Sequence, residues 1–417
     1  VVVGGVRRSA LISLSDLNDR EMRFAKSGQW WEQNVQRALA NNSVNYKEKP
    51  DVGTFMREWL SLYDSKSGER GIYNSMSAKR TVERLNGRYR DGSGDYIRRR
   101  IPREDFGTNP CSEIILRSRE FCNLSEVVIR RNDTRESLKA KVKHATILGT
   151  FQSTLTDFKY LSREWKRNCD EERLLGVSLT GIMDNPLTNG SKGKLDELLE
   201  ELRDVAYETN CEWADKLGVP RSAAITCVKP SGTVSQLVDS ASGIHARHNP
   251  FYIRTVRADN KDPLCKLMQE MGFPNEPDVT KPDHTTVFSF PMKSPNGAVC
   301  RTDMTAMEQL DLWKTYAESW CEHKPSVTIS VKEDEWVDVA AWVYENFDSI
   351  SGISFLPFSE HVYRQAPYQD CTEEEYKEAL KTMPKNVDWA ELSKYESQDY
   401  TVASQELACT AGGCEVI

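Results

Sequence analysis

The sequence lacks the long hydrophobic runs and the excess of basic residues that mark two large classes of protein. None of its apolar runs approaches the roughly 18 residues that a membrane-spanning helix requires, so an integral membrane protein is excluded. Its 55 Lys and Arg residues are outnumbered by 63 Asp and Glu residues, whereas nucleic-acid-binding domains are usually basic. We therefore expect neither a membrane nor a nucleic acid as its partner.

Signs of secretion are also lacking. The 417-residue chain has no recognisable signal peptide, and its cysteine count, 11, is odd. Both features argue against a secreted disulfide framework, so we expect reduced thiols and a cytoplasmic location. The chain begins at Val1 rather than at Met. We interpret it as a fragment, a processed product or a trimmed chain, in which an N-terminal targeting signal would be unseen.

Negative charge is concentrated near the C-terminus. Residues 369–417 contain eleven Asp or Glu, four Lys and no Arg, which accounts for nearly all of the net charge of −8. This pattern predicts a body over residues 1–368, close to neutral, with room for local basic patches that bind an anionic small molecule. It also predicts an acidic segment over 369–417 that ends in a flexible tail.

Short β-rich runs alternate with amphipathic helices along the body. The runs 10–14, 224–228, 286–290 and 327–331 have strand composition, whereas 55–63, 138–159, 195–206 and 307–321 have helical spacing. Gly218 is a plausible cap for the third of these helices. Strands that alternate with helices indicate an α/β fold with largely parallel strands.

One short segment contains several residues whose side chains could act together on a small ligand. Asn109, Cys111 and Glu113 fall within Asn-Pro-Cys-Ser-Glu-Ile, and Cys122 follows in Phe-Cys-Asn-Leu. Pro110 disfavours helical geometry at Asn109, so Cys111 is expected at the tip of a loop. A thiol supplies redox or radical chemistry, and a carboxylate can remove a proton from a hydroxyl. The alternative is a buried structural cysteine beside an unrelated surface glutamate.

A second pair of cysteines, Cys409 and Cys414, stands near the C-terminus with Gly-Gly between them. A loop of this size can close a disulfide without much strain. An accessible thiolate there could exchange with a buried disulfide, so we favour a dithiol shuttle. The alternatives are half of a zinc site or accidental spacing. Zinc requires further ligands, and we predict no metal site in this chain.

Two glycine-containing segments could bind an anionic ligand. Ser231, Gly232, Thr233 and Ser235 follow a predicted strand and could offer amide and hydroxyl groups to a phosphate, although they could equally cap a helix. Near the N-terminus, Gly4 and Gly5 permit a sharp turn beside Arg7 and Arg8. An ordinary hairpin turn with exposed arginines is the alternative for that segment.

Taken together, these segments resemble the catalytic subunits of ribonucleotide reductases. They are most similar to the monomeric, adenosylcobalamin-dependent type that reduces ribonucleoside triphosphates. Asn-Pro-Cys-x-Glu-Ile followed by Phe-Cys-Asn-Leu carries most of the resemblance. A chain-end position for the cysteine pair and the lack of an adjacent Tyr-Tyr pair favour the cobalamin type. Further similar segments are RALANNSV (37–44), ERLLGVSLTGIMD (172–184), PSGTVSQLVDSASGIHARH (230–248) and HKPSVTISV (323–331).

The resemblance implies a ten-stranded α/β barrel with a finger loop around 109–114. Cys111 would form the thiyl radical that abstracts the ribose 3′-hydrogen. Glu113 would be the base for the 3′-hydroxyl, Asn109 would orient the substrate hydroxyls, and Cys122 would be one of two reducing thiols.

The resemblance also implies roles for the outer segments and for partners. Cys409 and Cys414 would re-reduce the resulting disulfide and be recharged by a thioredoxin-like protein. Ser231, Gly232, Thr233 and Ser235 would hold the substrate phosphates. The turn with Gly4, Gly5, Arg7 and Arg8 would match the specificity loop, which responds to a deoxynucleotide effector.

Two consequences follow for the chain as given. The second reducing cysteine and the first barrel strands of the family precede the specificity loop, so we expect them to be missing here. An upstream polypeptide would then complete the barrel. The alternatives are a non-catalytic part of a split reductase, a reductase of diphosphates, or a thiol–disulfide oxidoreductase that uses Cys409 and Cys414.

Overall fold

The computed structural model describes most of the chain. The described residues are 11–30, 34, 37, 40–103, 105–232, 234–279, 281–358 and 364–396, together with the backbone of 410–411 and 414–415. Statements about structure below refer to these residues.

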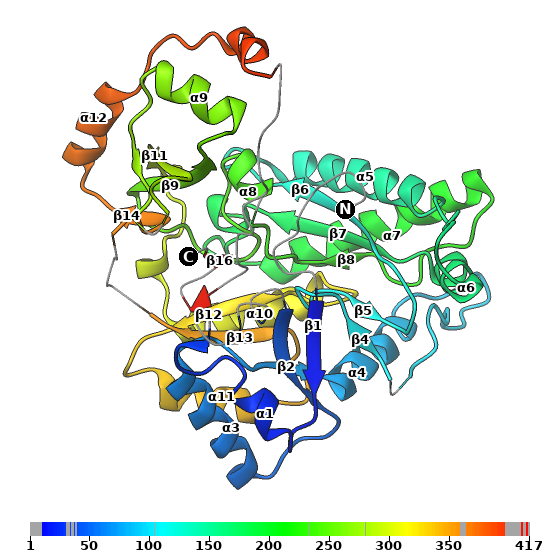
Figure 1. Ribbon diagram of the computed structural model, residues 1–417. Helices are drawn as coiled ribbons and strands as arrows, with labels where there is room; N and C mark the ends of the chain where they lie inside the picture. The colour runs from blue at the N-terminus through cyan, green and yellow to red at the C-terminus, as the bar shows by residue number, and fades with distance from the viewer. Residues whose placement is uncertain are drawn as a thin grey trace.

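Eight strands form the central sheet, in two groups that each run parallel (Figure 1). The first group contains β1 (Leu11–Ser15), β2 (Ala40–Tyr46) and β3 (Gly71–Asn74). The second group contains β6 (Asn123–Val128), β7 (Leu175–Thr180), β8 (Thr226–Cys227), β12 (Val327–Val331) and β13 (Ile353–Pro357).

Two junctions join these groups into one order. Strand β13 pairs antiparallel with β3 through Ile353 and Ile72. A parallel bridge between Val228 and Pro325 links β8 with β12. The order is therefore β1-β2-β3-β13-β12-β8-β7-β6, and no ladder among the described residues closes the sheet between β6 and β1. Parallel strands joined by helices agree with the predicted α/β class.

Helices pack around this sheet, and the amphipathic ones do so with their apolar face. In α7, the buried Leu195, Leu198, Leu199 and Leu202 recur at helical spacing, and Gly218 ends the helix at a φ of 66°. The helices packed around the sheet are α1 (Arg20–Arg23), α3 (Val52–Ser65), α4 (Ser75–Asn86), α5 (Arg135–Gln152), α6 (Arg163–Glu172), α7 (Leu195–Leu217), α8 (Val234–Leu237), α10 (Ala306–Ser319) and α11 (Trp336–Glu345).

A second, antiparallel sheet forms a lobe that projects from the body at the upper left of Figure 1. It contains β9 (Phe251–Asp259), β10 (Asn275–Pro277), β11 (Thr285–Lys293) and β14 (Tyr368–Asp370), with α9 (Pro263–Glu270) and α12 (Glu373–Thr382). The predicted boundary at 368/369 falls inside β14. Because β14 pairs with β9, residues 369–382 belong to this lobe rather than to a separate acidic segment.

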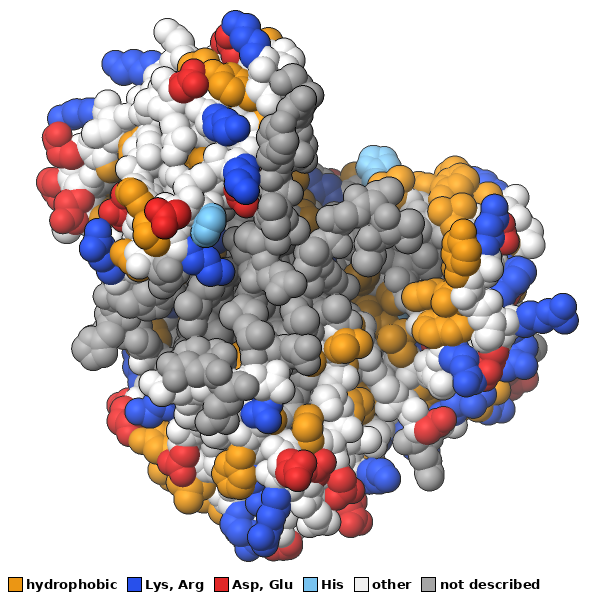
Figure 2. Space-filling view, in the orientation of Figure 1, with side chains coloured by type: hydrophobic (Ala, Val, Ile, Leu, Met, Phe, Trp, Pro, Cys, Tyr) orange, Lys and Arg blue, Asp and Glu red, His pale blue; other side chains and the backbone are white. Residues whose placement is uncertain are grey.

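One side of the molecule exposes large apolar side chains. They belong to α5, to the loop after it and to Phe121: Phe121, Leu148, Phe151, Leu155, Tyr160 and Leu161 are between 41 and 96% exposed. Figure 2 shows hydrophobic side chains gathered on the side where α5 and α6 lie. Surfaces of this kind often contact another protein surface. No helix among the described residues is long and apolar enough to cross a membrane.

Removal of a core aromatic ring tests this packing. Phe347 is fully buried, and its ring lies 4.9 Å from that of Tyr46 in β2 and 6.2 Å from that of Phe55 in α3. We expect Phe347→Ala to lower the free energy of unfolding by about 3–5 kcal/mol, because it leaves a cavity. Urea denaturation measures this loss. Val337→Ala on the exposed face of α11 is the control, and an equal effect of both variants would contradict the packing.

Candidate active site

A tight turn carries the first three predicted site residues. Strands β4 (Gly107–Thr108) and β5 (Ile115–Leu116) pair antiparallel and enclose residues 109–114. The Asn109 side-chain oxygen accepts a hydrogen bond from Ile114 N at 3.0 Å, and Ser112 N donates to Asn109 O at 2.9 Å. Thr108 Oγ1 donates to Ile114 O at 2.7 Å. Cys111 therefore stands half-buried at the tip of a closed turn, as Pro110 predicts.

Strands of both parallel groups hold this turn from outside. Lys324 N, just before β12, donates to Glu113 O at 3.0 Å. The Asn41 side-chain amide of β2 donates to Pro110 O at 2.6 Å. Gly352, just before β13, has a φ of 77°, and a Cβ there would lie 2.8 Å from Ser112 O. Ser112 itself has a φ of 65°, a conformation that non-glycine residues seldom adopt, so these contacts maintain a strained turn.

Glu113 is fully buried within this arrangement. Neither carboxylate oxygen has a hydrogen-bond partner that meets normal geometry among the described residues. Burial raises the pKa of Glu113, because it disfavours the charged form, while the Asn109 amide and the charges of Lys229 and Lys324 oppose this rise. A buried carboxylate with a raised pKa and unused acceptor atoms is suited to take up a proton.

Cys122 faces the same interior. A Cβ at Gly176 of β7 would lie 3.0 Å from Cys122 Sγ and 3.1 Å from the Ile114 side chain, so the glycine leaves room for both. Burial, followed by the negative charge of Glu113, raises the pKa of Cys122 well above its usual range. The same two causes raise the pKa of Cys227 in β8. These thiols stay protonated at neutral pH.

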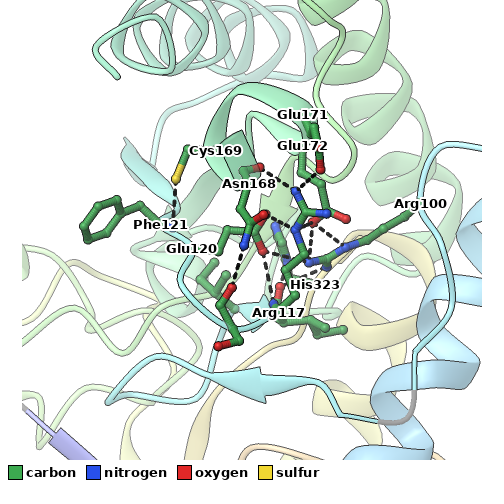
Figure 3. Close-up of polar contacts among 12 residues, drawn as sticks. Arg100, Arg117, Glu120, Phe121, Asn168, Cys169, Glu171, Glu172 and His323 are labelled. Carbon is green, nitrogen blue, oxygen red and sulfur yellow. Dashed lines mark hydrogen bonds and ion pairs between the residues drawn. The ribbon is translucent and has the colours of Figure 1, made fainter. Parts of the chain in front are cut away.

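A buried network of charged side chains fixes the segment between Cys111 and Cys122 (Figure 3). Arg100 donates to Ile115 O at 2.9 Å and pairs with Glu172 at 2.7 Å and with Glu120 at 3.3 Å. Arg117 also pairs with Glu120 at 3.2 Å and donates to Asn168 O at 2.7 Å. These contacts hold β5 against α6. Burial, followed by the charge of Glu172, raises the pKa of Glu120 to about 8.

His323 completes this support. Its Nδ1 accepts from Ile115 N at 3.2 Å, and its Nε2 lies 2.9 Å from Leu175 O. Nε2 must therefore carry the proton and donate to the carbonyl. Burial, then the charge of Arg100, lowers the pKa of His323 well below its usual value. A neutral His323 thus joins β5 to β7.

The predicted phosphate-binding residues lie in a compact turn after β8. Ser231 and Ser235 are buried, and Ser231 Oγ accepts from Ser235 N at 3.1 Å. Gly232 is exposed, whereas Thr233 lies outside the described residues. The hydroxyl of Ser242 donates to Ser231 O at 2.7 Å. The hydroxyls of Ser231 and Ser235 are engaged within the turn, so the exposed backbone at Gly232 is the part that faces outward.

The other predicted residues fall largely outside the described residues. This holds for Gly4, Gly5, Arg7, Arg8 and Cys409. Cys414 lies in β16 (Cys414–Glu415), which pairs with β15 (Thr410–Ala411) in a hairpin whose backbone alone is described. Within the described ranges, no group of three or more His, Cys, Asp or Glu side chains could hold a metal ion.

Five neighbours of the turn were not predicted as site residues: Asn41, Gly176, His323, Lys324 and Gly352. All of them but Gly352 fall in segments that the resemblance included without a role: RALANNSV, ERLLGVSLTGIMD and HKPSVTISV. The sequence gives a weak signal, because Lys324-Pro325 and Lys229-Pro230 both place a lysine beside an apolar strand.

Comparisons with known proteins agree on one family. The chain is 29% identical to the adenosylcobalamin-dependent ribonucleoside-triphosphate reductase of Euglena gracilis, over 93% of the chain and 51% of that protein. It is 26% identical to the protein of the same name from Lactobacillus gasseri, over 100% of the chain and 57% of the relative. The chain is similar to the adenosylcobalamin-dependent ribonucleoside-triphosphate reductases. No protein-family model matches it.

Solved structures show that this relative of the reductases has their fold. A crystal structure of a B12-dependent, class II ribonucleotide reductase matches with a TM-score of 0.73 and 21% identity, over 94% of the chain and 56% of the solved one. The α subunit of the Actinobacillus ureae class Id reductase matches with a TM-score of 0.54 and 14% identity, over 84% and 70%. The predicted barrel fold is confirmed, although the barrel is not closed here. The chain spans about half the length of the curated relatives it matches.

A methyl group at Gly352 tests the close contact between Gly352 and the backbone of Ser112. Gly352→Ala would strain a left-handed backbone and press on Ser112 O, whereas Gly272→Ala would strain a similar backbone, at a φ of 80°, with no atom within 4 Å. Each variant should lose about 1 kcal/mol of stability from the backbone alone. We expect a larger loss in Gly352→Ala, with faster alkylation of Cys111 measured by mass spectrometry. Equal losses and an unchanged alkylation rate would contradict the contact.

The pH dependence of stability tests the burial of Glu113. Its folded-state pKa lies above the unfolded value of 4.5. The folded protein therefore binds this proton more tightly, and stability falls as the pH rises from 4.5 through the folded pKa. Glu113→Gln has no such loss, so its urea midpoint should exceed that of the wild type by more at pH 8 than at pH 5. Glu374→Gln on the surface is the control, and a margin that does not change with pH would be contrary to this account.

Proposed function

We propose that this chain carries the catalytic centre of a ribonucleotide reductase, which converts ribonucleotides, and by preference triphosphates, into 2′-deoxyribonucleotides. One observation supports this most strongly: a fixed turn carries the half-buried Cys111 and, two residues further on, the fully buried Glu113, whose carboxylate has no ion pair among the described residues. The proteins to which the chain is similar are named ribonucleoside-triphosphate reductases. The chain spans only part of those proteins, so their activity is a proposal for this chain.

In the proposed reaction, Cys111 moves a hydrogen atom, Glu113 moves a proton and Cys122 supplies electrons. The Cys111 thiyl radical removes the 3′-hydrogen of the ribose and later returns it. Glu113 takes up the proton of the 3′-hydroxyl, and Asn109 orients the neighbouring hydroxyls. The 2′-hydroxyl leaves as water, while Cys122 and a second thiol are oxidised to a disulfide. One ribonucleotide and two thiols thus give one deoxyribonucleotide, one disulfide and one water.

Adenosylcobalamin is the proposed cofactor, and when bound it supplies the radical that Cys111 needs. The exposure of the site fits such a group. The Cys111 side chain is half-buried and can be reached from outside, whereas the Glu113 carboxylate is fully enclosed. Cys111 is therefore the residue of this site that would meet the cofactor, and the closed turn would keep water from Glu113.

Further parts of the proposal concern segments outside this centre. The backbone around Ser231, Gly232, Thr233 and Ser235 would hold the substrate phosphates. Gly4, Gly5, Arg7 and Arg8 would answer to a deoxynucleotide effector. Cys409 and Cys414 would return electrons to Cys122, and a thioredoxin-like protein in the cytoplasm would recharge them.

We also propose that a further polypeptide segment completes the barrel and supplies the second reducing thiol. The β1 and β6 edges of the sheet have backbone groups that no described strand pairs with. Unpaired edges accept additional strands readily. The apolar surface of α5 and the following loop lies on the β6 side of the sheet, since α5 packs on β6.

An anaerobic turnover assay tests the proposed function. It contains the chain, adenosylcobalamin, a ribonucleoside triphosphate, a deoxynucleotide effector and a dithiol. We expect deoxynucleotide formation that is abolished in Cys111→Ala and reduced by about 10²–10⁴-fold in Glu113→Gln. Cys371→Ser, in the projecting lobe, should retain activity.

The outcomes separate the possible explanations. Product formed by Cys111→Ala would refute the proposal. If the wild-type chain gives no product, the assay is repeated with the preceding segment of a relative added in trans. Restored activity would support a split enzyme, and continued absence of product would refute the reductase function for this chain.

A further inference from the structure

Lys324 is a buried amino group that the proposed reaction does not use. Lys324 precedes β12, and only 4% of its surface is exposed. Its Nζ lies 3.3 Å from Ser112 Oγ and 3.3 Å from Ser351 Oγ, and 4.5 Å from the centre of the Tyr73 ring. No carboxylate of the described residues lies within 4.0 Å of this ammonium group. A buried charge without a direct ion pair lowers the stability of the fold. The presence of a lysine at this position therefore needs an explanation.

The location of Lys324 supplies this explanation. Its backbone and its side chain both contact the turn: Lys324 N donates to Glu113 O at 3.0 Å, and Nζ reaches the hydroxyl of Ser112. Ser112 is the residue between Cys111 and Glu113, and it has a left-handed backbone. A donor on its side chain therefore restrains the torsions that set the thiol and the carboxylate relative to each other.

Charge links Lys324 to Glu113 as well. The groups that face Glu113 and can carry charge are Lys229, Lys324, Cys122 and Cys227. The two thiols are neutral at pH 7, so the lysines are the cations available to it. Burial lowers the pKa of Lys324 to about 7, and the charge of Glu113 opposes this fall. Each of these two buried groups thus favours the charged form of the other.

The remaining neighbours of Lys324 do not compete for this role. His323 is neutral, as its hydrogen bonds require, and the charge of Lys324 helps to keep it so. Tyr73 donates its hydroxyl to Phe106 O at 2.7 Å and offers only its ring face to the ammonium group. Burial raises the pKa of Tyr73, so it carries no negative charge.

We propose that Lys324 is a positioning residue for the reaction proposed above: it fixes the Ser112 turn between Cys111 and Glu113, and it holds Glu113 as the carboxylate that can accept a proton. Lys229 shares the second task but not the first, since its own backbone bonds to Ser178 Oγ rather than to the turn. This inference rests on the proposed function for its catalytic meaning, but its physical content can be measured in the resting protein.

Two readouts separate the two tasks. The first is the protonation midpoint of Glu113, taken from infrared spectra of protein labelled with ¹³C-glutamate, in which the band missing from Glu113→Gln identifies the residue. The second is the alkylation rate of Cys111, followed on its peptide by mass spectrometry. Neither readout needs nucleotide, cofactor or turnover, so failure here and failure of the Cys111→Ala assay are distinguishable.

Four variants give a matched design. Lys324→Met should raise the Glu113 midpoint by roughly one pH unit and accelerate alkylation of Cys111 severalfold. Lys229→Met should raise the midpoint alone. Ser112→Ala should accelerate alkylation alone. Lys324→Gln serves if the methionine variant does not fold, as judged by circular dichroism and the urea midpoint.

A folded Lys324 variant with the wild-type Glu113 midpoint, or with the wild-type alkylation rate, overturns the proposal. If neither Lys324 variant folds, Ser112→Ala decides, because an unchanged alkylation rate there would show that the ammonium–hydroxyl contact does not hold the turn.

Discussion

The site depends on one backbone contact, the hydrogen bond from Lys324 N to Glu113 O. The turn over residues 109–114 is short and contains a left-handed serine, so it needs support from outside to keep one conformation. The contact supplies it from the start of β12, and Gly352 and Asn41 add support from β13 and β2. A rigid sheet thereby fixes the relative positions of a thiol and a carboxylate, which catalysis by proximity requires.

The residues around Glu113 reduce the loss of stability that its burial causes. A fully buried Glu113 without a normal hydrogen-bond partner lowers stability, and the Asn109 amide and the charges of Lys229 and Lys324 limit that loss without a direct ion pair. Nearby, by contrast, Arg100 contacts Glu120 and Glu172 directly, and Arg117 contacts Glu120. The charged network is therefore structural, whereas the carboxylate on the turn has no close cation among the described residues.

The sequence predicted the parts of the fold that local patterns encode. Strand 327–331 is β12, and the leucine spacing with Gly218 is α7. Strand β2 was not recognised, because its ANNSVNY sequence is polar. Its structure explains this composition, since Asn41 bonds to the turn. Pro110 correctly indicated a loop tip at Cys111. Lys324 could not be found in this way, because it meets Ser112 only through the folding of segments 212 residues apart.

Amide hydrogen exchange at the turn tests the central claim most directly. The amides of Ile114, Ile115 and Lys324 donate to Asn109, His323 and Glu113, respectively. If the sheet fixes the turn, these three amides should exchange as slowly as those of the buried strand β7. Exchange as fast as that of the exposed loop at 91–95 would contradict the account, because it would show that the turn opens independently of the barrel strands.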